Sequence, residues 1–549
     1  MQSSELSRKQ RFKTGFISGG AAGIVASVLM LILSVKLGGL SLPEVFGSSL
    51  TQVMPPPLFD FLHRLIGGDA KHYLFYGILV GQCLVFAACG GLCSLLLGSE
   101  QFSAGRPSGQ LRWTDGLLLA LILWLVVGVF FLPLTGGGIF GMFLTNGLLS
   151  SMLSLAAVGI VFGLLFVSIF NQLILRELQK QEIVGPEHVS ETSLSRRVIL
   201  KRGAITLGVG ALGVLAWRFI AGAGGASSSA TRLVGQFKNK IIPPPIPNYG
   251  TIQPVAHLSP EISPNDQYYI VSKNLFSDPT VNGSTWSLRI HGLVNQPFTL
   301  NYNELMALPR KQQYESMMCI SNEVGGQYMS NAKWEGVPLV DLLKQAGLKL
   351  GATKVVLSAA DDYSDSIHLS KALEPTTLVA VRMNDVTLPD GHGFPARLLV
   401  PGIYGMKHVK WITDIEVVAT DYQGYWQTRG WSDAAPIRLT SRIDTPLTGT
   451  VFVANKPTYI AGVAFSGNKG ISEVDVSLDE GNTWQHAVLK QPLSNLTWVL
   501  WELPWTPTQG PHTIIVRAVD MEGNVQDPVQ ESPLPNGSSG YHTISVSAH

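Results

Sequence analysis

Long apolar stretches separated by short polar connections dominate the first 222 residues of the chain. The stretches cover residues 15–36, 73–98, 115–135, 149–171 and 203–222. A helix rises about 1.5 Å per residue, so each stretch is about long enough to cross the ~30 Å hydrocarbon core of a bilayer. The pattern therefore predicts an α-helical membrane bundle in residues 1–222 with about five transmembrane helices.

Lysine and arginine are unevenly distributed among the connections between these stretches. Residues 1–14, 99–114 and 172–202 together carry twelve of them, whereas the intervening connections carry Lys36, Arg64 and Lys71. Because cytoplasmic connections are usually the more basic ones, the three basic segments mark the cytoplasmic side. With five spans, everything after residue 222 is expected on the extracytoplasmic side of the plasma membrane.

The fifth stretch is rich in glycine and alanine, contains Arg218, and follows the sequence SRRVILK at residues 195–201. This sequence resembles a twin-arginine export signal, which directs folded proteins across the membrane. A basic stop at the end of a helix is the alternative interpretation. Ala221-Gly222-Ala223 can serve as a signal-peptidase site, so the segment is either cleaved or kept as an anchor.

The composition narrows the classes of ligand and partner. Charged residues make up 14% of the chain, compared with about 25% in typical soluble domains, and the formal net charge is +1. Such a balance provides no overall field for nucleic acid, so no nucleic-acid partner is predicted. A b-type haem in the membrane needs buried axial ligands, but His63 and His72 are the only histidines before residue 180. No haem is therefore expected.

The remainder of the chain has the pattern of a soluble protein in three parts. Residues 223–248 contain runs of serine and proline, which predict a linker. Residues 249–430 mix strand patterns (286–290, 354–357, 412–418) with a helical pattern at 339–346, which predicts an α+β domain. Residues 431–549 show strand patterns broken at Gly467-Asn468, Gly481-Asn482 and Gly523-Asn524. These dipeptides predict β-hairpin turns in an immunoglobulin-like β-sandwich.

Two segments of the α+β domain carry residues that can hold a ligand. Cys319 is the only cysteine after the membrane region and lies in MMCISNEVGG at residues 317–326. A lone cysteine is more often a small buried side chain than a ligand. Residues 390–411 place Arg397, Lys407, His408 and Lys410 among glycines and prolines, which indicates a phosphate or another anionic ligand. A solvated basic loop with ion pairs is the alternative.

These two segments resemble those of the sulfite oxidase-type molybdenum-cofactor enzymes. HGFPARLLVPGIYGMKHVKW at residues 392–411 is similar to the family's pterin-binding segment, and CISNEVGG occupies the place of its molybdenum-binding cysteine loop. Residues 462–466, 479–484 and 516–520 look like parts of the family's C-terminal dimerisation domain. The resemblance covers residues from about 250 to 549 and implies a homodimer formed through the C-terminal domain.

The resemblance also implies roles for particular residues. Cys319 would supply a thiolate to molybdenum held by a single molybdopterin, a role suited to a soft sulfur ligand. The residues implied to bind the pterin and its phosphate are Lys273, Asp361, His392, Arg397, Lys407 and Lys410. Tyr363 corresponds to a tyrosine near the metal's substrate-facing oxygen, where a phenol can donate a hydrogen bond. A half-exposed strand aromatic is the alternative interpretation of Tyr363.

The sequence departs from the family's pattern where sulfite oxidases carry the arginines of their anion pocket. Val271 stands at the first of these places, and Asn322-Glu323-Val324 lacks the second. Without these guanidinium groups, a doubly charged oxyanion loses bidentate contacts and meets the carboxylate of Glu323. Sulfite is therefore not the expected substrate.

We therefore expect a membrane-attached, extracytoplasmic molybdopterin oxidoreductase that carries out two-electron, oxygen-atom-transfer chemistry on a small substrate. The sequence shows no recognisable haem or flavin domain, so a separate electron-transfer partner is expected. A reductase for sulfoxides, including oxidised methionine, is the alternative enzyme. A non-catalytic membrane receptor or assembly protein that uses the sandwich is an alternative of another class.

Overall fold

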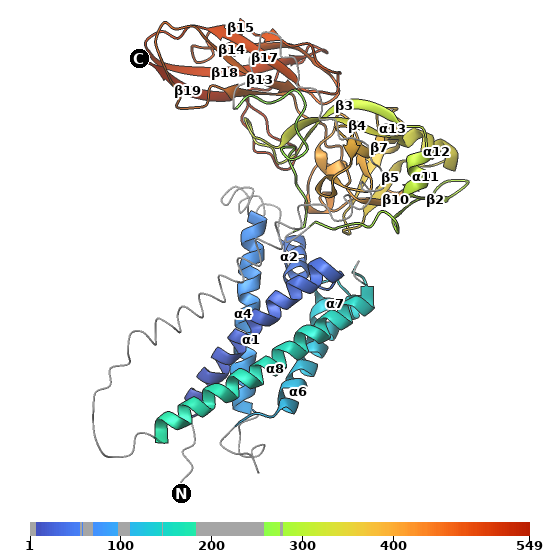
Figure 1. Cartoon of the computed structure of the whole chain (residues 1–549). Helices are drawn as coiled ribbons and strands as arrows, with labels where there is room; N and C mark the ends of the chain where they lie inside the picture. The colour runs from blue at the N-terminus through green and yellow to red at the C-terminus, as the bar shows by residue number, and fades with distance from the viewer. Residues whose placement is uncertain are drawn as a thin grey trace. The chain divides into compact units, whose positions relative to one another are not determined.

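The computed structural model of the protein describes residues 7–54, 58, 70–96, 110–144, 147–182, 257–274 and 278–549. The chain divides into two compact units, an N-terminal helical unit and a unit that contains the C-terminal domains (Figure 1). The predicted fifth membrane helix at 203–222, the twin-arginine-like sequence and the linker lie outside the described residues.

The helical unit contains α1 (Arg8–Leu37), α2 (Leu42–Val53), α4 (Ala70–Leu96), α6 (Trp113–Leu125), α7 (Leu132–Leu134) and α8 (Gly147–Glu182). A π-helical turn, η2 (Val126–Phe131), joins α6 to α7, and the 3-10 turn η3 (Ile139–Gly141) follows. Among the described residues, four helices are long and apolar enough to cross a membrane: Arg8–Leu37, His72–Leu96, Trp113–Leu134 and Gly147–Glu177. They coincide with the first four predicted spans.

Small residues let some of these helices approach each other closely, and many large apolar residues are exposed. α1 packs against α4 and α8, as Figure 1 shows. A Cβ atom on Gly19 of α1 would lie 2.6 Å from the carbonyl oxygen of Phe86 in α4, so glycine lets the two backbones approach closely. Large apolar side chains such as Leu134 and Leu149 point outward and are exposed. Such a surface suits a hydrocarbon surrounding better than water.

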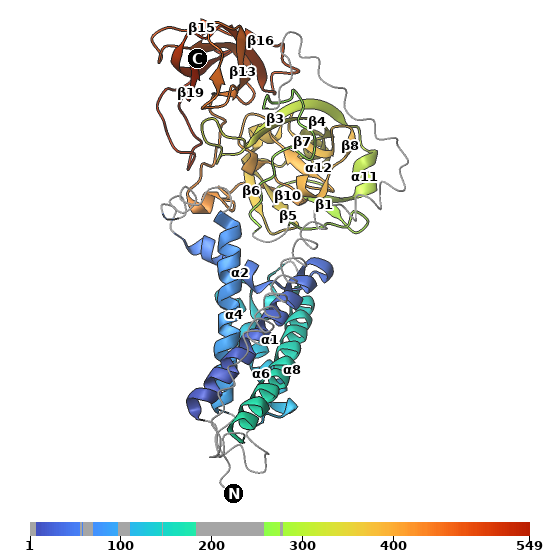
Figure 2. The ribbon, with the colours of Figure 1, turned by 60° about the vertical axis from the view of Figure 1, so that its left-hand side comes forward.

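The α+β domain is built on two sheets of five strands. The first has the order β2 (Phe298–Asn301), β1 (Ser287–Gly292), β10 (Ile412–Val418), β5 (Lys354–Ala359) and β6 (Ser364–His368). The second has the order β3 (Lys311–Met318), β4 (Met329–Pro338), β7 (Leu378–Met383) and β8 (Val386–Thr387), with β9 (Arg397–Leu399) paired to β7. Figure 2 shows β6, β5, β10 and β1 of the first sheet beside β3, β4 and β7 of the second.

Apolar side chains of both sheets and of three short helices form one core. The helices are α11 (Tyr302–Ala307), α12 (Leu339–Ala346) and α13 (Leu369–Ala372). α12 occupies the residues of the predicted helix, and Leu339, Leu342 and Leu343 lie on its buried face at the spacing of an amphipathic helix. Strands β5 and β10 likewise contain the predicted strand patterns, and β1 covers the pattern at 286–290 except Trp286. The core supports the loops that follow β3 and surround β9.

The C-terminal domain is a two-sheet β-sandwich. One sheet has the order β11 (Thr440–Thr445), β13 (Thr458–Phe465), β17 (Val499–Trp505) and β16 (Val488–Leu489). The other has the order β12 (Val451–Phe452), β19 (His542–Ala548), β18 (Gly510–Asp520), β14 (Ile471–Ser477) and β15 (Gln485–His486). Ile460 and Trp501 of the first sheet share a buried core with Val474 and Ile514 of the second. Its immunoglobulin-like character stays a prediction.

One of the predicted hairpin turns is wrong. Gly467-Asn468 joins β13 to β14, which lie in different sheets, so this turn carries the chain across the sandwich. Gly481-Asn482 does join the antiparallel pair β14 and β15. Gly467 and Gly481 have φ angles of 74° and 91°, so both turns use glycine's freedom at positive φ. Local turn chemistry is therefore the same whether or not the flanking strands pair.

Candidate active site

Cys319 lies directly after β3, where the chain turns out of the second sheet. Its backbone N–H donates to the carbonyl oxygen of Tyr328 at 2.9 Å, and its own carbonyl oxygen accepts from the N–H of Asn322 at 3.1 Å. The side-chain oxygen of Asn322 accepts in turn from the N–H of Tyr328 at 2.8 Å. These bonds hold the Cys319 side chain, which is buried, at the wall of a cleft. Burial raises the pKa of its thiol.

The β-sandwich supports the other side of the same loop. Arg442 of β11 donates to the carbonyl oxygen of Gly326 at 2.6 Å, and Ser538 donates to that of Asn322 at 2.8 Å. The ring of His542 lies against Gly325, where a Cβ atom would be only 2.5 Å from the ring. The φ angle of Gly325 is 76°, a second reason why glycine is needed there. The C-terminal domain therefore helps to position Cys319.

Arg397 is the most deeply embedded cation of the cleft. It begins β9 and is 4% exposed. Its guanidinium donates to the carbonyl oxygens of His392 at 3.1 Å and His408 at 3.4 Å, and lies 5.3 Å from the ring centre of Trp334. Among the described residues, its Nε has no hydrogen-bond partner. A buried guanidinium with an unused donor is suited to an anionic ligand.

Two histidines and Lys410 surround Arg397. The Nε2 atom of His392, in the 3-10 turn η4 (Asp390–His392), lies 2.8 Å from the carbonyl oxygen of Asn265. Burial lowers the pKa of His392 to about 4 and that of His408 to about 3, so both rings are neutral at pH 7. The ammonium of Lys410 donates to the carbonyl oxygen of Gly391 at 3.1 Å and lies 4.1 Å from the ring centre of Trp411.

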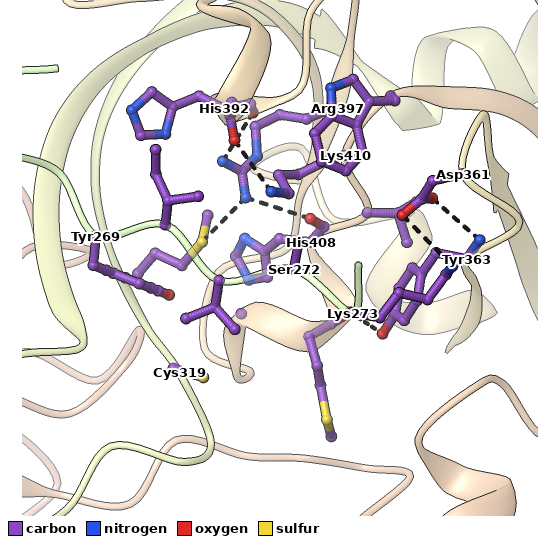
Figure 3. A pocket seen from close by; sticks show the side chains of 18 of the residues that line it. Tyr269, Ser272, Lys273, Cys319, Asp361, Tyr363, His392, Arg397, His408 and Lys410 are labelled. Carbon is purple, nitrogen blue, oxygen red and sulfur yellow. Dashed lines mark hydrogen bonds and ion pairs between the residues drawn. The ribbon is translucent and has the colours of Figure 1, made fainter. Parts of the chain in front are cut away.

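A cleft of about 790 Å³, open solvent at its mouth included, brings these residues together. Seven of the eight predicted site residues line it: Cys319, Tyr363, Lys273, Asp361, His392, Arg397 and Lys410. In Figure 3, His392, Arg397 and Lys410 lie together and Cys319 lies apart from them. Lys273 and Asp361 form an ion pair with 4.0 Å between nitrogen and oxygen. The cleft therefore has a cationic part and a part that contains the thiol.

Lys407 is not among the residues that line the cleft. It ends the 3-10 turn η5 (Gly405–Lys407), and its ammonium donates to Asp365 at 2.8 Å, to the carbonyl oxygen of Ser366 at 2.9 Å and to Asp433 at 3.0 Å. An ammonium has three protons, and all three are used here. The prediction that Lys407 grips the cofactor therefore disagrees with its contacts, which are those of a structural ion pair.

Tyr363 lines the cleft, but its hydroxyl is already engaged. The hydroxyl oxygen lies 2.8 Å from the carbonyl oxygen of Met406 and 3.0 Å from the carboxylate of Asp365. Burial and the nearby Asp365 carboxylate raise the pKa of Tyr363. These contacts favour the interpretation of Tyr363 as a structural aromatic residue at the edge of the cleft. Its action on a metal-bound group stays a prediction.

Aromatic residues that the sequence analysis did not assign also line the cleft. Trp426 and Trp431 are stacked with 4.1 Å between ring centres. The hydroxyl of Tyr269 is buried and has no hydrogen-bond partner among the described residues. Gly405 leaves room for it, because a Cβ atom there would lie 2.7 Å from that hydroxyl. The density of aromatic residues at 425–431, a segment without strand alternation, was the signal available in the sequence.

The polar groups of the cleft fit a molybdopterin cofactor. Arg397 and Tyr269 offer unpartnered buried donors, and Lys410 adds positive charge for a phosphate. The carboxylate of Asp361 can accept hydrogen bonds from the amino-rich edge of a pterin. The thiol of Cys319 provides a soft ligand for the metal. When bound, such a cofactor supplies reversible two-electron chemistry, while the chain provides a ligand, charge and access.

Comparison with known proteins agrees with this fit. The model of the oxidoreductase molybdopterin binding domain matches residues 276–426, and that of the Mo-co oxidoreductase dimerisation domain matches residues 436–533. Sulfite oxidase of Arabidopsis thaliana is 30% identical over 342 residues, which cover 50% of this chain and 85% of that protein. The chain belongs to the sulfite oxidase-type family of molybdopterin oxidoreductases. Its cofactor is a molybdenum–molybdopterin, in agreement with the binding domain matched at residues 276–426.

Other relatives define how far the similarity extends. Mitochondrial sulfite oxidase of Homo sapiens is 31% identical over 338 residues, which cover 52% of this chain and 61% of the human protein. The chain therefore spans about three fifths of the length of this relative. Among solved structures, the sulfane dehydrogenase SoxCD from Paracoccus pantotrophus has a TM-score of 0.45 and 22% identity, covering 58% of this chain and 92% of that one. Both family models match residues beyond the helical unit.

Proposed function

We propose that this protein is a membrane-attached, extracytoplasmic oxidoreductase that transfers an oxygen atom and two electrons to or from a small uncharged substrate. The observation that carries the proposal is the apolar and aromatic lining that shares the cleft with Cys319. Ile270, Val271, Met406 and the stacked pair Trp426 and Trp431 contribute to this lining. An uncharged substrate can be desolvated against such a surface at little cost.

The cations of the cleft do not form a second anion site beside this lining. Arg397 is the only arginine among the described residues that line the cleft, and its two terminal nitrogens donate to the backbone carbonyl oxygens of His392 and His408. Lys273 is paired with Asp361. The exposed carboxylate of Glu323, four residues after Cys319, adds negative charge to the loop. A sulfite dianion would therefore meet few uncommitted cations once the cofactor is in place.

A sulfoxide reductase is the form of this function that the lining favours most. A sulfoxide is uncharged, carries alkyl groups that pack on aromatic faces, and has one oxygen that can be transferred. Reduction of a sulfoxide to a thioether consumes two electrons and two protons and releases water. The electrons would come from a separate redox partner.

The test uses the full chain, produced in a host that makes molybdopterin and purified in detergent. Molybdenum is quantified per chain, and turnover is then compared for dimethyl sulfoxide with reduced viologen and for sulfite with ferricyanide. We expect kcat/KM for the sulfoxide to exceed that for sulfite by about 100-fold or more, since the buried unpaired charge of sulfite costs several kcal/mol. Saturation by micromolar sulfite with rapid turnover would refute the proposal.

Cys319→Ala serves as the matched control for both assays. The variant should lose molybdenum and turnover while it keeps its fold, because it removes the soft ligand and leaves only a small void. Circular dichroism and elution volume check the fold. If this variant retained molybdenum and activity, the assignment of Cys319 as the metal ligand would be wrong.

The membrane orientation and the dimer are part of the same proposal. The excess of basic residues in 1–14, 99–114 and 172–202 supports a cytoplasmic N-terminus and an extracytoplasmic catalytic domain. Protease added outside intact spheroplasts should remove an epitope tag placed after residue 549, whether the domain crosses the membrane folded or unfolded. The match of residues 436–533 to a dimerisation domain supports a homodimer. Sedimentation of the purified chain should give the mass of two protomers.

A further inference from the structure

The hydroxyl of Ser321 lies 3.0 Å from the sulfur of Cys319. Ser321 is two residues after Cys319, is partly buried, and lines the same cleft. In the part of the chain that the structure describes, the Cys319 sulfur is the only hydrogen-bond partner of this hydroxyl. The contact therefore ties a polar side chain of the loop directly to the atom that is assigned to the metal.

The loop holds Ser321 in this position. Cys319 bonds through its backbone to Tyr328 and to Asn322, and the side-chain oxygen of Asn322 accepts from the N–H of Tyr328. The carbonyl oxygens of Asn322 and Gly326 are held from the β-sandwich by Ser538 and Arg442. With both flanks of Ser321 anchored, little conformational entropy is left to lose when its hydroxyl bonds to sulfur.

The direction of the hydrogen bond follows from the chemistry of the metal ligand. A cysteine that binds a metal has lost its proton, so its sulfur can only accept. The hydroxyl of Ser321 must then be the donor. A hydrogen bond to a ligating sulfur withdraws electron density from it and weakens its donation to the metal. This change stabilises the electron-rich reduced metal relative to the oxidised metal, so the reduction potential rises.

We infer that Ser321 is a positioning residue that orients the Cys319 thiolate and raises the reduction potential of the metal centre through an O–H···S hydrogen bond. The inference rests on Cys319 being the metal ligand, as the proposed function requires. It concerns the reduction potential rather than the identity of the substrate. It therefore holds for either direction of oxygen transfer.

The test compares the wild type with Ser321→Ala, which removes the hydroxyl, and Ser321→Thr, which keeps one. Each protein is produced as the full chain with cofactor, and results are expressed per bound molybdenum. Ser321→Ala should shift the oxidised-to-reduced ratio at a fixed ambient potential about tenfold toward the oxidised form, which is about 30 mV for a two-electron couple. The thiolate-to-metal charge-transfer band should move to lower energy. Ser321→Thr should match the wild type in both measurements.

Three results would overturn the inference. One is a Ser321→Ala protein with the potential and the absorption band of the wild type. Another is a Ser321→Thr protein that shifts as far as Ser321→Ala, because packing rather than the hydroxyl would then be responsible. The third is a change in KM with an unchanged potential, which would place Ser321 on the substrate.

A measurement on the wild type covers the case in which Ser321→Ala does not load the cofactor. The one-electron-reduced metal is paramagnetic and can be studied by electron paramagnetic resonance. A hydroxyl proton that is hydrogen-bonded to the sulfur ligand gives a weak hyperfine coupling, and this proton exchanges with solvent. That coupling should disappear in deuterium oxide and be restored in water. Its absence from the wild-type spectrum in water would overturn the inference. The Ser321 variants could also keep their molybdenum and show an unchanged reduction potential, while Cys319→Ala loses the metal. This result would support the proposed site but would exclude the role of Ser321.

Discussion

Arg397 and Lys407 lie ten residues apart on one segment and are both almost fully buried, yet their surroundings differ. Lys407 belongs to an ion-pair cluster with Asp365, Asp433 and Lys354, in which each ammonium contacts a carboxylate. Arg397 donates only to uncharged groups, and in the described part of the chain it forms no ion pair and keeps an unpartnered Nε. A buried cation therefore indicates a ligand only where its charge is not already matched.

The largest effect is expected from breaking the ion-pair cluster. Lys407→Met would leave the buried carboxylate of Asp365 without its main partner, which costs about 3–5 kcal/mol of unfolding free energy. Urea unfolding of the purified chain, followed by tryptophan fluorescence, measures this loss. The double variant Lys407→Met with Asp365→Asn should recover much of it, because no uncompensated charge is left. An unchanged urea midpoint for Lys407→Met would show that the ion pairs of Lys407 do not stabilise the fold.

Arg397 should behave in the opposite way. Arg397→Met should lower the bound pterin and molybdenum about tenfold or more, because the charge-assisted hydrogen bonds to the cofactor are lost. Its unfolding free energy should fall by less than that of Lys407→Met, since the lost hydrogen bonds go to uncharged carbonyl oxygens and no buried carboxylate is left without a partner. Arg397→Lys should give an intermediate cofactor content, because it keeps the charge but not the planar fork. Full cofactor content in Arg397→Met would show that Arg397 is structural.

Lys410 is expected to contribute less to cofactor binding than Arg397. Its ammonium donates to the carbonyl oxygen of Gly391, lies over the ring of Trp411 and forms an ion pair with Asp278 at 3.7 Å, so much of its charge is already matched within the protein. Lys410→Met should therefore reduce the molybdenum content by about threefold, within the range of one partly exposed charge contact. Each variant is dialysed against mild denaturant, and the molybdenum that remains per chain gives the relative affinities for the cofactor. A loss as large as that of Arg397→Met would contradict this order.

The smallest effect concerns Glu315, whose carboxyl group is buried and lies 3.8 Å from the Nδ1 atom of His408. Burial raises the pKa of Glu315 to about 8, against the opposing effects of Gln313, Arg397 and Lys371. The folded state thus keeps a proton that the unfolded state loses above its ordinary pKa near 4.5. Its contribution to stability therefore falls as the pH rises toward 8.

Glu315→Gln isolates this contribution, because glutamine mimics the protonated acid at every pH. From pH 6.5 to 8, the variant should become steadily more stable relative to the wild type. His392 and His408 are neutral in the folded state throughout this window, and their titration in the unfolded state near pH 6.5 is common to both proteins, so it cancels in the difference. Thermal unfolding midpoints of the two proteins across this range provide the measurement. A constant difference would mean that Glu315 is ionised in the folded protein.

Much of the local structure followed from the sequence. The apolar stretches identified four helices of membrane-spanning length, and the helical pattern at 339–346 coincides with α12. Both depend on side-chain periodicity, which neighbouring residues determine on their own. The turn at Gly467-Asn468 was also recognised, but not its consequence. Whether the flanking strands pair depends on β11, β17 and β18, which are distant in the sequence.

By itself, the sequence determined the residue types of the site: one soft sulfur at Cys319 and a set of cations in the segment 390–411. Only the tertiary structure decided which cations face the cleft. Lys407 and Lys410 are three residues apart, yet the chain turns so that Lys407 meets Asp365 from β6 and Asp433 from the connection to the sandwich. Charge is a property of a residue, but the matching of charges is a property of residues that only folding brings together.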